Sequence, residues 1–184
     1  MKIYIDFDRT IFDCDKFIED FYNLLEKYDI SKNDFIKYQS QCMDFNPYDI
    51  LDLMSKDYDI NKEVYNAIDN FIRKSSDYIF SDTIPFLKYI KNKNYQVIIL
   101  TKGNYDFQMS KIINSHIDLY YDDVIVTNKH KGDLDIDYTN SIFIDDREEE
   151  IESIKKRNPK RVIFIQRGNV NSNISSLNEL INKI

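Results

Sequence analysis

The chain has 184 residues, of which 42% are hydrophobic, and only three glycines and three prolines, so a disordered or fibrous protein is excluded. A net charge of −7 disfavours binding along a long nucleic acid, which requires a basic surface. No apolar stretch approaches the roughly 20 residues that cross a bilayer, and the N-terminus does not read as a secretory signal. We therefore expect a cytoplasmic protein without membrane contact, in which Cys14 and Cys42 stay reduced.

The first predicted element is a buried strand over residues 2–7, KIYIDF, with two aspartates where it ends. Side chains of a strand repeat every two residues, so Asp6 and Asp8 are expected on one face, about 7 Å apart along the chain. Open α/β sheets bind ligands at this carboxyl end of their strands. Like charges raise each other's pKa unless a cation lies between them, and Mg²⁺ binds through one or two carboxylates. The alternative is a solvated turn with two surface aspartates.

Residues 15–80 carry helical patterns of their own, because the interval before the next strand is far longer than a crossover helix requires. Apolar residues recur there at the i, i+3, i+4 and i+7 positions of one helix face. We predict a small all-helical cap inserted into a core domain of residues 1–14 and 81–184. We expect the aromatic residues of the cap to lie mainly in the apolar core. Residues 13–15 and 45–48 are the candidates for lining a cleft between the cap and the core domain. The predicted helical stretches are 17–28, 50–54 and 64–72.

The rest of the chain alternates strands with helices. The apolar runs are continuous and rich in isoleucine and valine, which is typical of strands buried on both faces of a parallel sheet. One helical pattern follows Pro85, and another begins with EEE and ends in basic residues, as the helix dipole favours. This alternation predicts a doubly wound, Rossmann-like α/β sheet, with a polar surface loop at 169–176. The further strands are expected at 95–100, 123–127, 141–145 and 161–165.

Polar side chains follow the second and third of these strands. Thr101 is followed by Lys102 and Gly103, and a hydroxyl with free backbone N–H groups at a strand-to-helix turn is suited to phosphate oxygens. An ordinary helix-capping threonine is the alternative. Lys129 and Lys131 come after the third strand, and either could neutralise an aspartate–phosphate pair or remain an exposed charge.

The fourth strand ends in Asp145 and Asp146. These carboxylates could complete a cation site at the strand ends together with the first aspartate pair, or serve only as an acidic helix start. The acidic run at 148–150 is interpreted as a helix start alone. Placement of all these groups at four successive strand ends favours the functional interpretation.

The set DFDRT, VIILT, a lysine and IFIDD resembles the four-motif signature of the haloacid dehalogenase (HAD) superfamily. The resemblance covers the whole chain, and the helical insertion is similar to the type 1 cap of the phosphatase-like branch. The combination of DxDxT with a terminal DD is specific, whereas the lysine motif is weak by itself. Arg9 departs from the pattern, because the family often has glycine at this place.

The resemblance implies a Mg²⁺-dependent phosphatase that hydrolyses a small phosphorylated metabolite through an aspartyl-phosphate intermediate. Asp6 would be the nucleophile. Asp8 would protonate the leaving group, then activate water, and would bind Mg²⁺ through its backbone carbonyl. Thr101 and Lys102 would form the turn that binds the phosphoryl group. Lys131, or else Lys129, would pair with Asp6 and the phosphate. Asp145 would complete Mg²⁺ binding, with Asp146 assisting.

Other functions stay open on the sequence alone. A phosphomutase would keep the same residues, and a nucleotidase or an enzyme that repairs nucleic-acid ends would use the same chemistry on another substrate. A non-catalytic relative would use the cleft to bind a phosphorylated ligand or a partner protein. A dehalogenase is disfavoured, because the second aspartate of DxD is not part of its pattern in this superfamily. The sequence identifies neither the substrate nor the oligomeric state.

Overall fold

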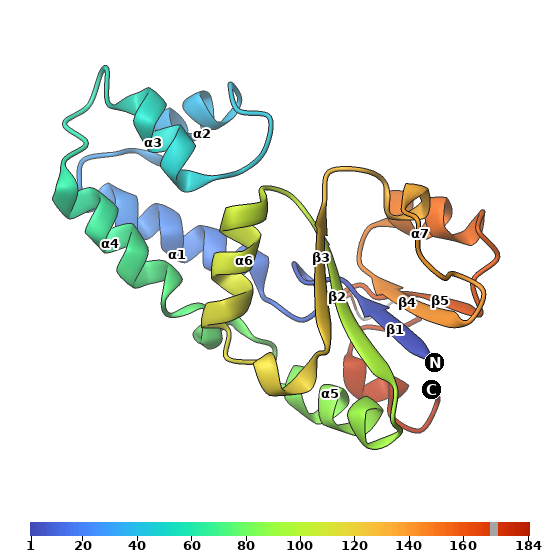
Figure 1. Cartoon of the computed structure of the whole chain (residues 1–184). Helices are drawn as coiled ribbons and strands as arrows, with labels where there is room; N and C mark the ends of the chain where they lie inside the picture. The colour runs from blue at the N-terminus through green and yellow to red at the C-terminus, as the bar shows by residue number, and fades with distance from the viewer. Residues whose placement is uncertain (170–172) are drawn as a thin grey trace.

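In the computed structural model, which describes residues 1–169 and 173–184, five strands form one parallel sheet in the order β3-β2-β1-β4-β5 (Figure 1). β1 is central, with Ile3 opposite Val97 of β2 on one side and Ile142 of β4 on the other. The carboxyl ends of β2, β1 and β4 are therefore neighbours at one edge. The strands are β1 (Lys2–Ile5), β2 (Gln96–Lys102), β3 (Asp123–Thr127), β4 (Ser141–Asp145) and β5 (Arg161–Phe164).

Helices cover both faces of this sheet, which confirms the Rossmann-like α/β prediction. Alternate residues of the inner strands face opposite sides: Ile5 and Ile99 pack into the larger apolar core, while Tyr4 and Ile98 pack into a smaller one. The larger core contains residues of α5 (Thr83–Asn92), α6 (Tyr105–Asn114) and η4 (Leu177–Leu180), and the smaller one contains Ile154 of α7 (Glu148–Lys155). The remaining 3-10 turns are η1 (Ser75–Tyr78), η2 (Asp118–Tyr120) and η3 (Lys131–Asp133).

The insertion between β1 and β2 is helical, and Figure 1 shows it to one side of the sheet, with α6 between the two. Its helices are α1 (Cys14–Glu26), α2 (Lys32–Gln39), α3 (Pro47–Met54) and α4 (Lys62–Ile72). α1, α3 and α4 match the predicted stretches. The sequence does not predict α2, because this helix buries only Phe35 and has no apolar stripe.

The insertion packs onto the loop after β1 and onto α6 through aromatic rings. The ring centroids of Phe17 on α1 and Phe12 after β1 are 5.3 Å apart, and Phe17 lies 6.3 Å from Phe107 on α6. One apolar core therefore runs through both parts, so the domain boundaries at 15 and 80 stay a prediction.

Three other features bear on the sequence expectations. Cys14 and Cys42 are both free thiols. Across 1–169 and 173–184, no helix combines the length and the apolar character that a membrane span needs. The surface loop predicted at 169–176 lies partly outside the described residues.

Candidate active site

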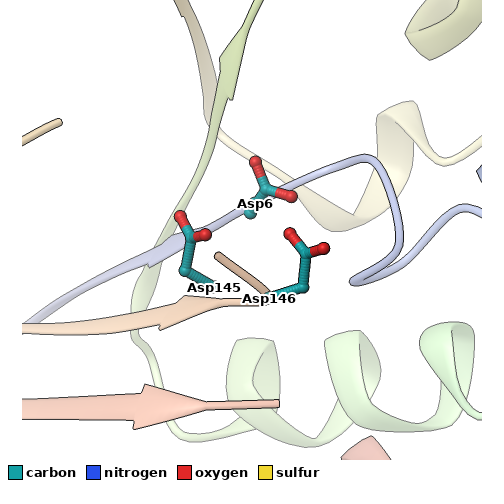
Figure 2. A group of neighbouring side chains, drawn as sticks. All are labelled: Asp6, Asp145 and Asp146. Atoms are coloured by element: carbon teal, nitrogen blue, oxygen red, sulfur yellow. The ribbon is translucent and has the colours of Figure 1, made fainter. Parts of the chain in front are cut away.

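The ends of β1 and β4 bring three carboxylates together. Asp6 directly follows β1, and its backbone N–H donates to the carbonyl of Ile144 at 2.9 Å, which continues the parallel ladder by one residue. Asp145 is the last residue of β4, and Asp146 follows it. One oxygen from each of the three side chains lies within 4.8 Å of the others, and Figure 2 shows the carboxylates gathered around a common space. Acids from distant parts of the sequence thus meet at one place.

Lys131 supplies an ammonium to this group. It lies in η3, with Nζ 2.5 Å from Asp6 Oδ1 and 2.6 Å from Asp145 Oδ2. Its side chain is only 2% exposed, and although burial disfavours the charged form, Asp6 and Asp145 outweigh burial and raise the pKa of Lys131. Lys129 is exposed, so of the two candidate lysines the structure brings only Lys131 to the carboxylates.

The three carboxylates are short of positive charge. Burial raises the pKa of Asp6 well above its usual range even though Lys131 opposes the shift. Burial, and then the neighbouring Asp145, raise the pKa of Asp146 to about 6. In the described part of the chain, no lysine, arginine or histidine pairs with the Asp146 carboxylate. Hard oxygen ligands with an excess of negative charge fit a divalent cation such as Mg²⁺.

The Asp8 carboxylate lies outside this group. β1 ends at Ile5, so the strand alternation expected from the sequence does not reach Asp8. Its side chain meets α6 instead, where Lys111 Nζ lies 2.5 Å from one carboxylate oxygen and Gln108 Nε2 donates to the other at 2.8 Å. Burial works against the charged form, but Lys111 and Gln108 outweigh it and hold the pKa of Asp8 below its usual value. The structure therefore corrects the expected pair of Asp6 and Asp8 carboxylates around one cation, because Asp6 is grouped with Asp145 and Asp146 instead. The Asp8 backbone carbonyl as a Mg²⁺ ligand stays a prediction.

Thr101 and Lys102 end β2, the strand beside β1. Thr101 is buried at this end, where the sequence predicts a phosphate-binding hydroxyl. Lys102 lines the cavity beside Asp8, and its ammonium donates to Glu150 Oε1 of α7 at 2.8 Å, so its phosphate-binding role stays a prediction.

Glu150 is a residue of the site that the sequence interpretation missed. It is fully buried, its second oxygen accepts the backbone N–H of Lys131 at 2.7 Å, and His130 Nδ1 lies 3.1 Å from the first. The interpretation of 148–150 as a helix start alone is thus wrong for Glu150. Its spacing from Ile151 and Ile154 on the buried face of α7 is the signal that could have found it.

A cavity of about 470 Å³ adjoins Asp8 and is lined by both the insertion and the core. The insertion contributes residues such as Phe17, Asp44 and Phe45, and the core contributes Gly103 and Asn128. Asn128 Nδ2 donates to Asp44 Oδ2 at 3.2 Å, which joins the two sides. Of the expected cleft residues, Cys14 and Phe45 line the cavity, whereas Asp13 caps α1 by accepting from the backbone N–H of Lys16.

Arg9 fits the position that glycine often takes in the family. Its φ is +56°, in the left-handed region that residues other than glycine seldom adopt. Its guanidinium Nε donates to Asp15 Oδ1 at 2.8 Å, so the charge is directed at the start of α1.

The fold and this arrangement of strand-end residues define a hydrolase of the HAD type. The family model of haloacid dehalogenase-like hydrolases matches residues 3–164. The chain therefore belongs to this family. No curated protein sequence matches it.

Solved structures share the fold. A HAD phosphatase from Thermococcus onnurineus is 21% identical, with 100% of this chain and 97% of that chain covered and a TM-score of 0.70. A protein provisionally assigned as a haloacid dehalogenase-like hydrolase, from Burkholderia xenovorans, is 14% identical, with 97% and 96% covered and a TM-score of 0.76. A provisionally assigned HAD-hydrolase from Bacillus subtilis, bound to magnesium and described as revealing interdomain movement, is 13% identical, with 99% and 97% covered and a TM-score of 0.63.

Proposed function

We propose that the protein is a phosphatase that hydrolyses a small phosphorylated metabolite, with Mg²⁺ held by Asp6, Asp145 and Asp146. The observation that carries this proposal is the convergence of these three carboxylates within 4.8 Å, with the Lys131 ammonium on two of them. Family membership supports hydrolysis, and the neighbour named as a phosphatase supports phosphate esters as the substrate class. The magnesium-bound neighbour supports the choice of cation.

In the first step, the Asp6 carboxylate attacks phosphorus while the bond from phosphorus to the ester oxygen breaks. Asp8 is ionised in the free enzyme, so it takes the proton that a phosphate monoester monoanion carries and passes it to that oxygen. The leaving group then departs as an alcohol, Asp8 is again a carboxylate and Asp6 becomes an aspartyl-phosphate. Lys131 offsets charge on Asp6 and on the phosphoryl oxygens, and the Thr101 hydroxyl holds one of those oxygens. Bound Mg²⁺ supplies further positive charge, which lets an anionic nucleophile approach an anionic substrate.

In the second step, the Asp8 carboxylate takes a proton from water as the water oxygen attacks phosphorus. The acyl phosphate bond to Asp6 breaks, which releases phosphate and restores the Asp6 carboxylate. A phosphomutase would use the same residues but would pass the phosphoryl group to another hydroxyl of the substrate. A cleft built partly by the insertion supports residues 15–80 as the cap that selects the substrate.

The test is a phosphate-release screen of phosphorylated metabolites and a general aryl ester, with and without Mg²⁺. We expect Mg²⁺-dependent release by the wild type and none by Asp6→Asn, whose fold is checked by circular dichroism. A wild type that is inert on the whole panel would favour a phospho-ligand-binding protein. Transfer to another position of a sugar without free phosphate would favour a mutase, and turnover confined to nucleotides would favour a nucleotidase.

The expected setting of this activity is the cytoplasm, because free thiols suit a reducing compartment. The proposed partner is a small phosphorylated substrate and not a long nucleic acid, since the net charge is −7.

A further inference from the structure

Two buried residues of α6 hold the Asp8 side chain, although neither belongs to the motifs at the strand ends. Lys111 is 2% exposed and Gln108 is 5% exposed, and together they bind both oxygens of the Asp8 carboxylate at 2.5 and 2.8 Å. All three residues line the cavity beside the proposed active site.

The orientation of the Gln108 amide is fixed by its partners. Its Nε2 donates to Asp8 Oδ2 and also to the backbone carbonyl of Lys102 at 2.9 Å. Both partners are acceptors, so the amide must present its NH₂ group to them. Gly103 leaves space for this contact, since a Cβ there would lie only 3.1 Å from Gln108 Nε2 and the backbone has a φ of +133°.

The Lys111 ammonium is fixed by a different environment. It lies 5.1 to 5.5 Å from the ring centroids of Phe7, Phe12 and Phe107, within the range of cation–π contacts. Among the described residues, Asp8 is the only carboxylate that pairs with it. A buried ammonium that loses its carboxylate partner is costly, so this pair resists rotation of the Asp8 side chain.

We propose that Lys111 and Gln108 are positioning residues, which keep the Asp8 carboxyl group on the cleft and away from Asp6, Asp145 and Asp146. This inference rests on the proposed phosphatase function. A carboxyl held at the cleft stays within reach of the leaving group, and it does not compete for the cation. Substitution of Lys111 or Gln108 therefore frees the Asp8 side chain. This change slows proton transfer from Asp8 to the leaving group more than it slows the attack of Asp6 on phosphorus.

The test compares two classes of ester in the Mg²⁺-loaded enzyme. A p-nitrophenyl ester leaves without a proton because the phenolate is stable, whereas an alkyl ester such as glycerol phosphate requires one. We measure kcat/KM, which reports only the steps up to departure of the leaving group and so excludes the later attack of water, in which Asp8 also acts. We expect Lys111→Met to lower kcat/KM on the alkyl ester about 100-fold, the scale of acid–base catalysis, and to affect the aryl ester far less, so the ratio of alkyl-ester to aryl-ester kcat/KM falls. Gln108→Leu changes the same ratio in the same direction, and Lys111→Arg restores part of the alkyl-ester activity because it keeps the cation.

Lys93→Met is the matched control, since Lys93 is exposed and caps the end of α5 that precedes β2, at the opposite edge of the sheet from the site. It removes the same charge and leaves the ratio unchanged. Equal losses in kcat/KM on both esters in Lys111→Met and Gln108→Leu overturn the inference while the phosphatase function stands. If Lys111→Met does not fold, the ratio in Gln108→Leu decides alone. A wild type without Mg²⁺-dependent turnover overturns the phosphatase proposal itself.

Discussion

Glu150 determines how the two lysines of the site are held. Its carboxylate accepts the Lys102 ammonium at one oxygen and the backbone N–H of Lys131 at the other. Burial works against its charged form, but Lys102 and the Lys131 N–H outweigh burial and lower the pKa of Glu150. Glu150 therefore stays ionised at neutral pH and fixes the backbone from which the Lys131 side chain reaches Asp6.

Replacing Glu150 by glutamine tests this function. The amide is close in size, but its neutral oxygen binds the Lys102 ammonium less strongly and one acceptor is lost. Hydrogen bonds to charged groups contribute about 1.5 to 3 kcal/mol, so we expect the free energy of unfolding in urea to fall by about 2 kcal/mol. We also expect kcat for phosphate release to fall about tenfold, which corresponds to about 1.4 kcal/mol in the barrier.

Glu148→Gln is the control, because Glu148 has the same charge on the same helix but is exposed. Wild-type kcat in Glu150→Gln, with the same unfolding free energy, would show that the carboxylate is not needed to hold Lys131.

The sequence predicts one part of the site at the residue scale and misses another. Asp6, Asp145 and Asp146 are predictable because each stands where an apolar strand stops, and parallel strands end at one edge. The partners of Asp8 are not predictable from the sequence, since Lys111 lies 103 residues away and no local pattern connects the two residues.

At the scale of elements, the contact between η3 and α7 positions Lys131. Gly132 lies in η3, and its backbone N–H donates to Ser153 Oγ of α7 at 3.2 Å. A Cβ on Gly132 would lie 2.3 Å from the backbone carbonyl oxygen of Ser153. Backbone cannot give way as a flexible side chain can, so only glycine allows η3 to pack this closely.

We expect Gly132→Ala to push η3 away from α7 and with it the adjacent Lys131. Overpacking of this kind costs about 1 to 3 kcal/mol, so the free energy of unfolding should fall by about 2 kcal/mol and phosphate release should drop with it. Urea denaturation and steady-state kinetics measure the two effects.

Gly168→Ala separates this close approach from the general cost of losing a glycine. A Cβ there meets nothing within 4 Å, but the φ of +71° imposes a strain of about 1 kcal/mol. We expect Gly168→Ala to be destabilised but to keep normal turnover, whereas Gly132→Ala loses turnover as well. Normal turnover in both variants would show that the close packing of η3 on α7 is not needed for activity.

A helix or strand can be predicted from the sequence where its buried positions are apolar and recur regularly, and less well where they are not. β3 and β4 have the predicted bounds, because their apolar runs stop at polar residues. The first strand ends two residues before its predicted limit, since the chain turns after Asp6, where three following backbone N–H groups donate to the carbonyl of Phe7. α6 contains Gln108 and Lys111 among its buried residues, so its inward face does not read as apolar from the sequence.

At the scale of the whole molecule, the Asp82 carboxylate joins three distant segments. Arg167 donates to Asp82 Oδ2 at 2.6 Å and, through Nε, to the carbonyl of Thr10 at 3.0 Å in the loop after β1. Ser176 Oγ and the backbone N–H of Leu177 donate to the same Asp82 oxygen at 2.6 and 2.8 Å. Asp82 thus ties together the segment where the chain returns from the insertion, the loop after β1 and the C-terminal turn η4. No local pattern in the sequence predicts this.

This cluster makes stability depend on pH. Burial disfavours the charged form of Asp82, but Arg167 and Ser176 outweigh it and hold the pKa of Asp82 below its usual 3.8. The unfolded chain then takes up a proton at a higher pH than the folded protein does, so folding is stabilised most above the unfolded pKa. The stabilisation falls as pH drops below about 3.9 and is lost below the folded pKa.

Asp82→Asn removes the charge but keeps an oxygen that can accept hydrogen bonds. We expect the free energy of unfolding at pH 7 to fall by about 2 kcal/mol, the scale of hydrogen bonds to a charged group. Because the wild type loses the same contribution in acid, the gap between the two proteins should narrow as pH falls from 5 to 3, as measured by urea denaturation at each pH. Asp59→Asn, at an exposed aspartate of the insertion, should show no such gap. A gap that stays constant down to pH 3 would mean that packing at this position, and not the charge of Asp82, holds the three segments together.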